Sequence, residues 1–137
     1  NAAFCAEAVG ALRQQHALTM EYAKTRKQFG RAIAEFQVLQ HRLVDMFMAV
    51  EESASIALLA TLKLDTPERA KHVSAAKAKI GRAIRFVGEN AIQTHGGMGV
   101  TDEMRVGHYF KRATMIDAQF GNADHHLKRF MALSKVA

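Results

Sequence analysis

Apolar residues recur every three or four positions along most of the chain, which is the spacing of one face of an α-helix. The first run with this period covers residues 3–27, with Gly10 inside it. A second run covers residues 33–64 without glycine or proline, and would form a helix about 45 Å long at 1.5 Å per residue. We therefore expect two long helices joined by a short connection at residues 28–32.

The segment after the second run predicts a stop followed by a new helix. Thr66 is suited to be an N-cap, Pro67 suits the first helical position, and the Glu68 carboxylate faces the positive end of the helix dipole. A third apolar run then continues to the glycines at positions 96, 97 and 99, where no helix continues easily. A third long helix is therefore expected between residues 67 and 95.

The last 40 residues predict shorter helices. Thr101–Glu103 can cap a helix that ends near Lys111, and a final helix is expected over residues 123–135. Residues 115–122 are ambiguous between helix and loop. Short connections make successive helices antiparallel neighbours. The pattern predicts an all-α fold: a single domain over residues 1–137, built as an up-and-down four-helix bundle with an extra short helix.

Composition agrees with a folded helical protein. The 137 residues are 49% hydrophobic with one proline, and a chain of this length can bury about two-thirds of its unfolded surface. No apolar run approaches the roughly 20 residues needed to span a bilayer, so we expect no membrane partner. The opening residues lack the pattern of a signal peptide. The lone cysteine, Cys5, cannot form an internal disulfide and favours a reducing, cytoplasmic location.

The net charge of +6 predicts attraction for phosphate-bearing ligands. Because basic residues are spread over every helix and interleave with acidic ones, nucleic acid is not an expected partner. No pair of histidines has metal-ligand spacing within one helix, so no metal site is expected. Of the adjacent His125 and His126, at most one faces the core, since neighbouring positions on a helix point about 100° apart.

Two segments have the features of a ligand site. In Tyr22–Gln37 a basic cluster meets a glycine turn at a helix junction, an arrangement that suits a diphosphate. The alternative is that Arg26 and Lys27 only favour a helix C-terminus while Phe29 fills the end of the bundle. In Gln93–Val100 three glycines permit close approach of a ligand to the backbone. A simple helix-terminating turn explains the same glycines, and no strand precedes them as a dinucleotide fingerprint requires.

Taken together, the two segments resemble the C-terminal domain of the flavin-dependent acyl-CoA dehydrogenases. Tyr22–Gln37 fits the family pattern Tyr-Ala-x-x-Arg-x-x-Phe-Gly-x-x-Ile-x-x-Phe-Gln, and Gln93–Gly99 fits Gln-x-x-Gly-Gly-x-Gly. The resemblance covers essentially the whole chain. It implies a four-helix bundle that pairs with a neighbouring subunit, with FAD lying across the pair.

The resemblance also implies which residues touch FAD. Arg26 would contact the pyrophosphate of an FAD held mainly by the partner subunit, and the glycine-rich segment would approach its ADP portion. The residues implied as cofactor contacts are Arg26, Gln28, Phe29, Gln37, Gln93, Gly96, Gly97, Asn122 and Asp124.

The chain departs from the family at the usual catalytic base. Many members have Tyr-Glu-Gly-Thr near the C-terminus, where the glutamate takes the α-proton of the acyl-CoA. Here the corresponding residues are Gln119–Asn122, and Phe120 has no titratable group. Other members place the base at or just before the position of Asn1. Asp117 and Asp124 are weak candidates for a displaced base. Asp117 is explained as well by a place on the polar surface of a helix, and Asp124 by the preference for acidic residues at a helix N-terminus.

The amino-acid sequence of the segments Gly107–Arg112 and Phe120–Leu127 is similar to that of the small subunits of pimeloyl-CoA dehydrogenase-type enzymes. The resemblance therefore implies the C-terminal, FAD-contacting and oligomerising domain of an acyl-CoA dehydrogenase, acting on an acyl-CoA within a homo- or hetero-oligomer. The alternative is a catalytically silent helical scaffold subunit. We expect the chain to be a C-terminal fragment of a longer protein and to be inactive in isolation.

Overall fold

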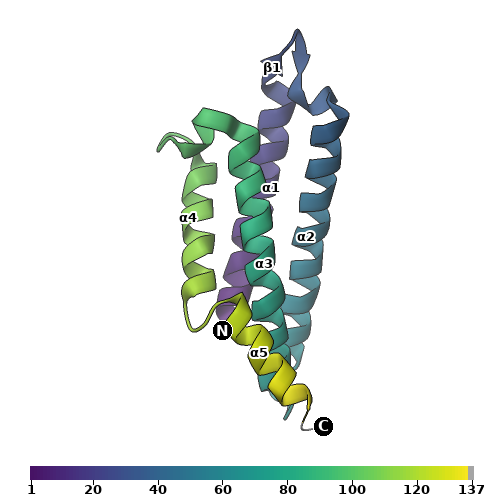
Figure 1. The fold of residues 1–137 in the computed structure, drawn as a ribbon, viewed down its shortest axis with the longest axis vertical. Coiled ribbons are helices and arrows are strands. Elements are labelled where there is room, and N and C mark those ends of the chain that lie inside the picture. Colours follow the sequence, from purple (N-terminus) through teal and green to yellow (C-terminus); the bar gives the residue numbers. More distant parts are fainter. Residues whose placement is uncertain (136–137) are drawn as a thin grey trace.

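The computed structural model describes residues 1–135 and is built almost entirely from helices (Figure 1). Four helices run up and down side by side, and a fifth, shorter helix crosses the lower half of α3. This confirms the predicted all-α four-helix bundle with an extra short helix. The elements are α1 (Ala2–Thr25), β1 (Lys27–Gln28), β2 (Arg31–Ala32), the 3₁₀ turn η1 (Ile33–Glu35), α2 (Gln37–Leu62), α3 (Arg69–His95), the 3₁₀ turn η2 (Gly96–Val100), α4 (Arg105–Ala118) and α5 (Ala123–Ser134).

Helix α3 is the central element, because α1, α2, α4 and α5 all pack against it. Its core positions include Ile80 and Val87, which are fully buried together with Leu12 of α1 and Met46 of α2. At Gly88 a Cβ atom would collide with the Phe110 ring of α4, so only glycine lets the two helices approach this closely.

The connection between α1 and α2 is a small β-hairpin. Strands β1 and β2 pair antiparallel around the two-residue turn Phe29-Gly30, where φ is 55° and 78°. The second helix was expected to start at Ile33, and this is wrong by four residues. Ile33 begins the 3₁₀ turn, in which the Glu35 carboxylate accepts from the Ala32 N–H at 3.2 Å, and α2 begins at Gln37.

Two threonines expected to cap helices do not. The Thr66 hydroxyl donates to the Lys63 carbonyl at 2.9 Å, and α3 begins only at Arg69. The Thr101 hydroxyl donates to the Met98 carbonyl at 2.9 Å, and α4 begins at Arg105. Each hydroxyl closes the turn that precedes it, which competes with capping the helix that follows.

The ambiguous stretch 115–122 is resolved into the end of α4 and a tight turn. Helix α4 continues to Ala118, well past the expected end at Lys111. In the turn, Phe120 and Gly121 have φ of 56° and 98°, and the Asn122 side chain accepts from the His125 N–H at 3.0 Å to cap α5. His126 is buried and His125 exposed, so one of the two histidines faces the core as predicted.

Within residues 1–135, no helix combines the length and apolar character needed to cross a bilayer. No group of three His, Cys, Asp or Glu side chains in the same residues is placed to hold a metal ion. Cys5 is a buried free thiol, and burial raises its pKa more than the nearby Lys77 lowers it, which disfavours the reactive thiolate.

Candidate functional site

The two segments singled out in the sequence meet at the hairpin end of the bundle. A groove of about 500 Å³ lies between the end of α1 with its hairpin and the end of α3 with η2. Arg26 and Gln28 line one side, and Gly96 and Gly97 line the other. Residues about 70 positions apart in the chain therefore form one surface, which we call the upper groove.

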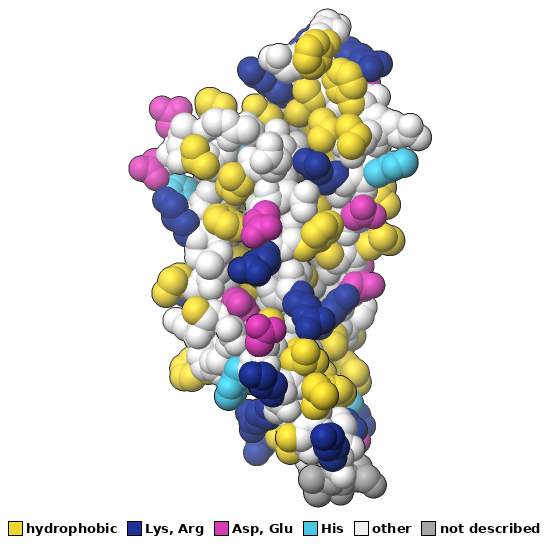
Figure 2. Space-filling view, in the orientation of Figure 1, with side chains coloured by type: hydrophobic (Ala, Val, Ile, Leu, Met, Phe, Trp, Pro, Cys, Tyr) yellow, Lys and Arg dark blue, Asp and Glu magenta, His cyan; other side chains and the backbone are white. Residues whose placement is uncertain are grey.

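The upper groove is open and carries one basic side chain in its lining, that of Arg26. A Cβ atom at Gly96 or Gly97 would meet nothing within 4 Å, so this stretch of backbone is accessible. Gly96 has φ of 62°, which favours glycine. On the hairpin the Arg31 guanidinium lies 4.1 Å from the Phe36 ring centroid. Figure 2 shows hydrophobic side chains flanked by Lys and Arg at this end of the molecule.

His95 lines the same groove and has one nitrogen without a partner. Its Nδ1 lies 2.8 Å from the Ala91 carbonyl, which only accepts, so Nδ1 carries the hydrogen. The Nε2 atom is then a buried acceptor with no hydrogen-bond partner in the described part of the chain. The ring also stacks on Tyr22, with centroids 4.4 Å apart. A basic side chain, open glycine backbone and an unmet acceptor fit an anionic ligand that also carries hydroxyl or amine donors.

Three of the predicted contacts lie near the upper groove but do not line it. Phe29 is at the tip of the hairpin, 90% exposed, with its ring 6.1 Å from Phe36 in an edge-on arrangement. Gln37 is the first residue of α2, and Gln93 is exposed near the end of α3. Sequence reasoning missed His95, although its position between Gln93 and Gly96 inside the glycine-rich segment was a usable signal.

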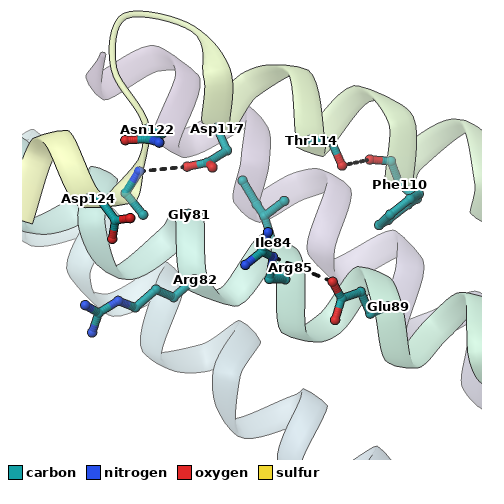
Figure 3. A pocket seen from close by; sticks show the side chains of 11 residues that line it. Gly81, Arg82, Ile84, Arg85, Glu89, Phe110, Thr114, Asp117, Asn122 and Asp124 are labelled. Carbon is teal, nitrogen blue, oxygen red and sulfur yellow. Dashed lines mark hydrogen bonds and ion pairs between the residues drawn. The ribbon is translucent and has the colours of Figure 1, made fainter.

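The other two predicted contacts, Asn122 and Asp124, lie elsewhere. They line a second pocket of about 500 Å³ between α3, α4 and the start of α5, which we call the lower pocket (Figure 3). On α3 this pocket is lined by Gly81, which lies about 22 Å along the helix axis from Gly96 of the upper groove at 1.5 Å per residue. The structure therefore does not bring Asn122 and Asp124 together with Arg26.

The two carboxylates considered as bases occupy different positions in the lower pocket. The Asp117 Oδ1 accepts from the Ala123 N–H at 3.1 Å, the contact drawn in Figure 3, and this links the end of α4 to the start of α5. Asp124 is exposed in the first turn of α5, where a negative charge favours the helix N-terminus. Phe120 is 71% exposed, and its ring lies 5.6 Å from that of Phe4.

A buried polar network supports the turn that carries Phe120. The Lys77 Nζ, with the side chain almost fully buried, donates to the carbonyls of Ile116 at 2.6 Å and Asp117 at 3.1 Å. Burial lowers the pKa of Lys77, and the nearby Asp117 carboxylate partly offsets this. His126 Nε2 lies 3.0 Å from the Phe120 carbonyl and donates to it, while burial lowers the pKa of His126. Sequence reasoning missed Lys77, which lies on the apolar stripe of α3 with Val73 and Ile80.

Comparison with known proteins decides the family. A family model described as acyl-CoA dehydrogenase, C-terminal domain, matches residues 2–132. The chain belongs to the acyl-CoA dehydrogenase family. The resemblance drawn from Tyr22–Gln37 and Gln93–Gly99 is thereby confirmed.

Individual relatives and solved structures agree with this family. The acyl-CoA dehydrogenase IpdE2 of Mycobacterium tuberculosis is 37% identical over 108 residues, which are 79% of this chain and 33% of that protein. The ChsE4-ChsE5 complex from the same species has a TM-score of 0.94 at 27% identity, covering 99% of this chain and 37% of that one. The FAD complex of PigA has a TM-score of 0.87 at 27% identity, covering 96% and 35%. The chain thus spans about a third of the length of these three proteins.

Proposed function

We propose that this bundle is the FAD-contacting and oligomerising C-terminal domain of an acyl-CoA dehydrogenase. The whole protein would desaturate an acyl-CoA thioester between its α- and β-carbons and pass the electrons to FAD. The observation that carries the proposal is the upper groove, where the two family motifs meet and Arg26 faces open glycine backbone. The PigA structure, described as an FAD complex, supports the cofactor.

The residues of the upper groove fit the ADP half of FAD. The Arg26 guanidinium would pair with the pyrophosphate through charge-assisted hydrogen bonds. The open backbone at Gly96 and Gly97 allows close approach, and Gln28 adds hydrogen-bonding capacity at the rim. Phe29, Gln37 and Gln93, which lie around the groove, would make outer contacts. When bound, FAD supplies the two-electron acceptor of the desaturation.

The separation of the two sites supports a cofactor shared between subunits. Arg26 lines the upper groove, whereas Asn122 and Asp124 line the lower pocket about 22 Å away along α3. We propose that each chain offers its upper groove to an FAD held mainly by a neighbour, and its lower pocket to its own FAD. At least a dimer is then required. The similarity to the ChsE4-ChsE5 complex supports pairing with an identical or a related subunit.

The proton acceptor of the reaction would lie outside the turn at Phe120, which cannot accept a proton. Asp117 accepts a hydrogen bond from the Ala123 N–H, which favours a structural role. Asp124 is exposed at a helix N-terminus, which favours the same. We place the base upstream of Asn1 or on a partner subunit.

We further propose that this bundle is one part of a longer cytoplasmic protein. The matched residues are only 33% of the length of the IpdE2 relative, and the lone buried Cys5 suits a reducing compartment. The bundle alone would be inactive.

The test is to produce the full-length protein alone and with related subunits encoded beside it. The expected result is a yellow protein that, in at least one pairing, reduces an electron-accepting dye when acyl-CoA is added. A colourless protein that reduces no dye in any pairing would contradict the proposal.

A catalytically silent scaffold subunit is the second candidate, favoured by Phe120 in place of the usual glutamate. It predicts a partner whose flavin content and dye reduction do not change when Arg26 of this chain is replaced by alanine. Loss of flavin from the complex in that variant would exclude it.

A further inference from the structure

Two phenylalanine side chains that are far apart in the chain meet beside the turn between α4 and α5. Phe4 lies in the first turn of α1, and the centroid of its ring is 5.6 Å from that of Phe120, with the two planes tilted by 39°. Figure 1 shows the N-terminus next to the loop that joins α4 to α5. Phe120 is 71% exposed and Phe4 is half-buried. We call these two residues the aromatic pair.

Phe120 has a backbone conformation that its side chain does not favour. Its φ is 56°, in the left-handed region where a residue with a Cβ atom is strained. An exposed ring gains little from burial, so the stability of the bundle explains neither the position of this ring nor the strain beneath it. Strain that the surrounding structure maintains is typical of residues at active sites and ligand clamps.

Buried polar side chains hold this turn in place. The His126 Nε2 donates to the Phe120 carbonyl at 3.0 Å. On the other side of the turn, the Lys77 Nζ donates to the Asp117 carbonyl at 3.1 Å. Both Lys77 and His126 are almost fully buried. Hydrogen bonds from a buried shell are the means by which a ligand-contacting side chain is fixed before the ligand arrives. The turn therefore presents a rigid, exposed aromatic ring.

The aromatic pair adjoins the lower pocket. Phe120 lies two residues before Asn122, which lines that pocket together with Asp117 at the end of α4. In the proposed function, on which this inference rests, the lower pocket takes the chain's own FAD. The acyl group must reach that FAD to be desaturated, so the surface beside the pocket lies on its path.

The chemistry of the two surfaces decides which part of the reactants each one fits. The pair carries no charge, whereas five residues that line the lower pocket are charged. These are Arg82, Arg85, Glu89, Asp117 and Asp124. FAD and CoA both carry charged phosphates, and the acyl group is the apolar part of an acyl-CoA. Apolar surface is favoured against apolar surface, so the acyl group fits the aromatic pair.

We propose that the aromatic pair contacts the acyl group of the substrate and raises the preference for an acyl group that carries a ring over a straight chain. Aromatic rings gain from offset or edge-on contact with each other beyond the area that they bury. A ring on the substrate gains this contact with Phe4 and Phe120, whereas a straight chain gains only the buried area. The pair thus acts on specificity and takes no part in proton transfer.

The test compares two substrates whose acyl groups have the same number of carbons, phenylpropanoyl-CoA and nonanoyl-CoA. It uses the full-length, flavin-loaded protein, with its partner subunit where one is needed. The ratio of kcat/KM for the two substrates is measured by dye reduction. Binding is measured separately, through the change in flavin absorbance on adding the unsaturated products cinnamoyl-CoA and nonenoyl-CoA.

Phe120→Leu removes the ring and keeps apolar bulk, and because the side chain is exposed, folding is retained. The preference for phenylpropanoyl-CoA is expected to fall about fivefold. The dissociation constant of cinnamoyl-CoA should rise by a similar factor, with that of nonenoyl-CoA little changed. Phe4→Leu should shift the preference in the same direction. Phe86→Leu, an exposed phenylalanine of α3 outside the upper groove and the lower pocket, is the control and keeps the wild-type ratio.

The outcomes separate this inference from the proposed function. An unchanged ratio and unchanged binding in Phe120→Leu, with flavin and dye reduction retained, would overturn the inference and leave the proposed function standing. Weaker binding of FAD with an unchanged ratio would assign the pair to the flavin and overturn the inference as well. An equal shift in Phe86→Leu would do the same. A full-length protein that contains no flavin in any pairing would overturn the proposed function, and the inference with it.

Discussion

The two turns that carry the predicted cofactor contacts share a backbone motif and differ in what lies beneath it. Phe29-Gly30 in the hairpin and Phe120-Gly121 between α4 and α5 both have positive φ at both residues. Each phenylalanine is largely exposed, at 90% and 71%. A left-handed conformation costs a non-glycine residue roughly 1–2 kcal/mol, so each turn is held by its surroundings.

The surroundings differ in kind. The hairpin is held by backbone pairing, with Lys27 opposite Ala32 and Gln28 opposite Arg31, and the Arg31 guanidinium also packs on the Phe36 ring. The lower turn is held by side chains: Lys77, Asp117 and His126 each bond to backbone groups in or next to it. The polar groups of the lower turn are therefore used to fix its own shape, whereas in the proposed function those of the hairpin are used for binding.

Replacing Lys77 should have the largest effect on stability, because its side chain supports the lower turn. Lys77→Ala leaves the Ile116 and Asp117 carbonyls without their donor and opens a cavity in the core, which we expect to lower the free energy of unfolding by about 3 kcal/mol. Urea denaturation measures this. Lys77→Met restores packing without the donor and should lose less. Lys79→Ala, an exposed neighbour in a surface ion pair, should change stability by less than about 1 kcal/mol. A loss of equal size in the Lys79 variant would contradict the role of the network.

Replacing Arg26 is the corresponding change in the upper groove, and it should affect binding without affecting stability. Arg26→Ala removes a charge-assisted contact to the proposed pyrophosphate, worth about 1.5–3 kcal/mol. We expect FAD to bind at least tenfold more weakly in the full-length protein, measured by flavin fluorescence, with an unchanged melting temperature of the apoprotein. Arg69→Ala, at the start of α3 and outside both sites, is the matched control. Equal flavin retention in the two variants would count against the upper groove.

The lower turn should also respond to pH through His126. Its folded pKa lies below the ordinary value of about 6.5 because burial disfavours the charged ring. The unfolded chain therefore binds a proton more readily, so stability should fall as the pH drops below about 6.5 and level off once it passes the lowered pKa. His126→Gln should reduce this dependence, whereas His125→Gln, the exposed neighbour, should retain it. Denaturation curves between pH 5 and 8 provide the measurement, and an unchanged slope in His126→Gln would contradict the assignment.

Periodicity predicted the helices well but not their ends or their junctions. Apolar spacing over 20 or more residues determines a helix, whereas its first residue depends on single hydrogen bonds such as that of Thr66 to Lys63. The upper groove was predicted as two separate segments, because no local sequence pattern indicates that Arg26 and Gly97 lie on the same groove. The buried acceptor of His95 depends on a tertiary environment that no spacing reveals. Lys77 was in principle visible, as a lysine within an apolar stripe.

The smallest expected effect comes from replacing the phenylalanine with positive φ in each of the two turns. Asparagine is preferred before glycine in a two-residue hairpin turn with positive φ at both positions. Phe29→Asn loses the edge contact with Phe36 but removes a ring that is 90% exposed, so we expect the free energy of unfolding to rise by about 0.5–1 kcal/mol. Phe120→Asn relieves similar strain but also loses the contact with Phe4, and should leave stability nearly unchanged. Because Phe29 is also a proposed FAD contact, its variant should gain stability while binding flavin more weakly. If the Phe29 variant gained both stability and flavin affinity, the hairpin phenylalanine would have no binding role. The contrast between the two turns would then rest on Arg26 alone.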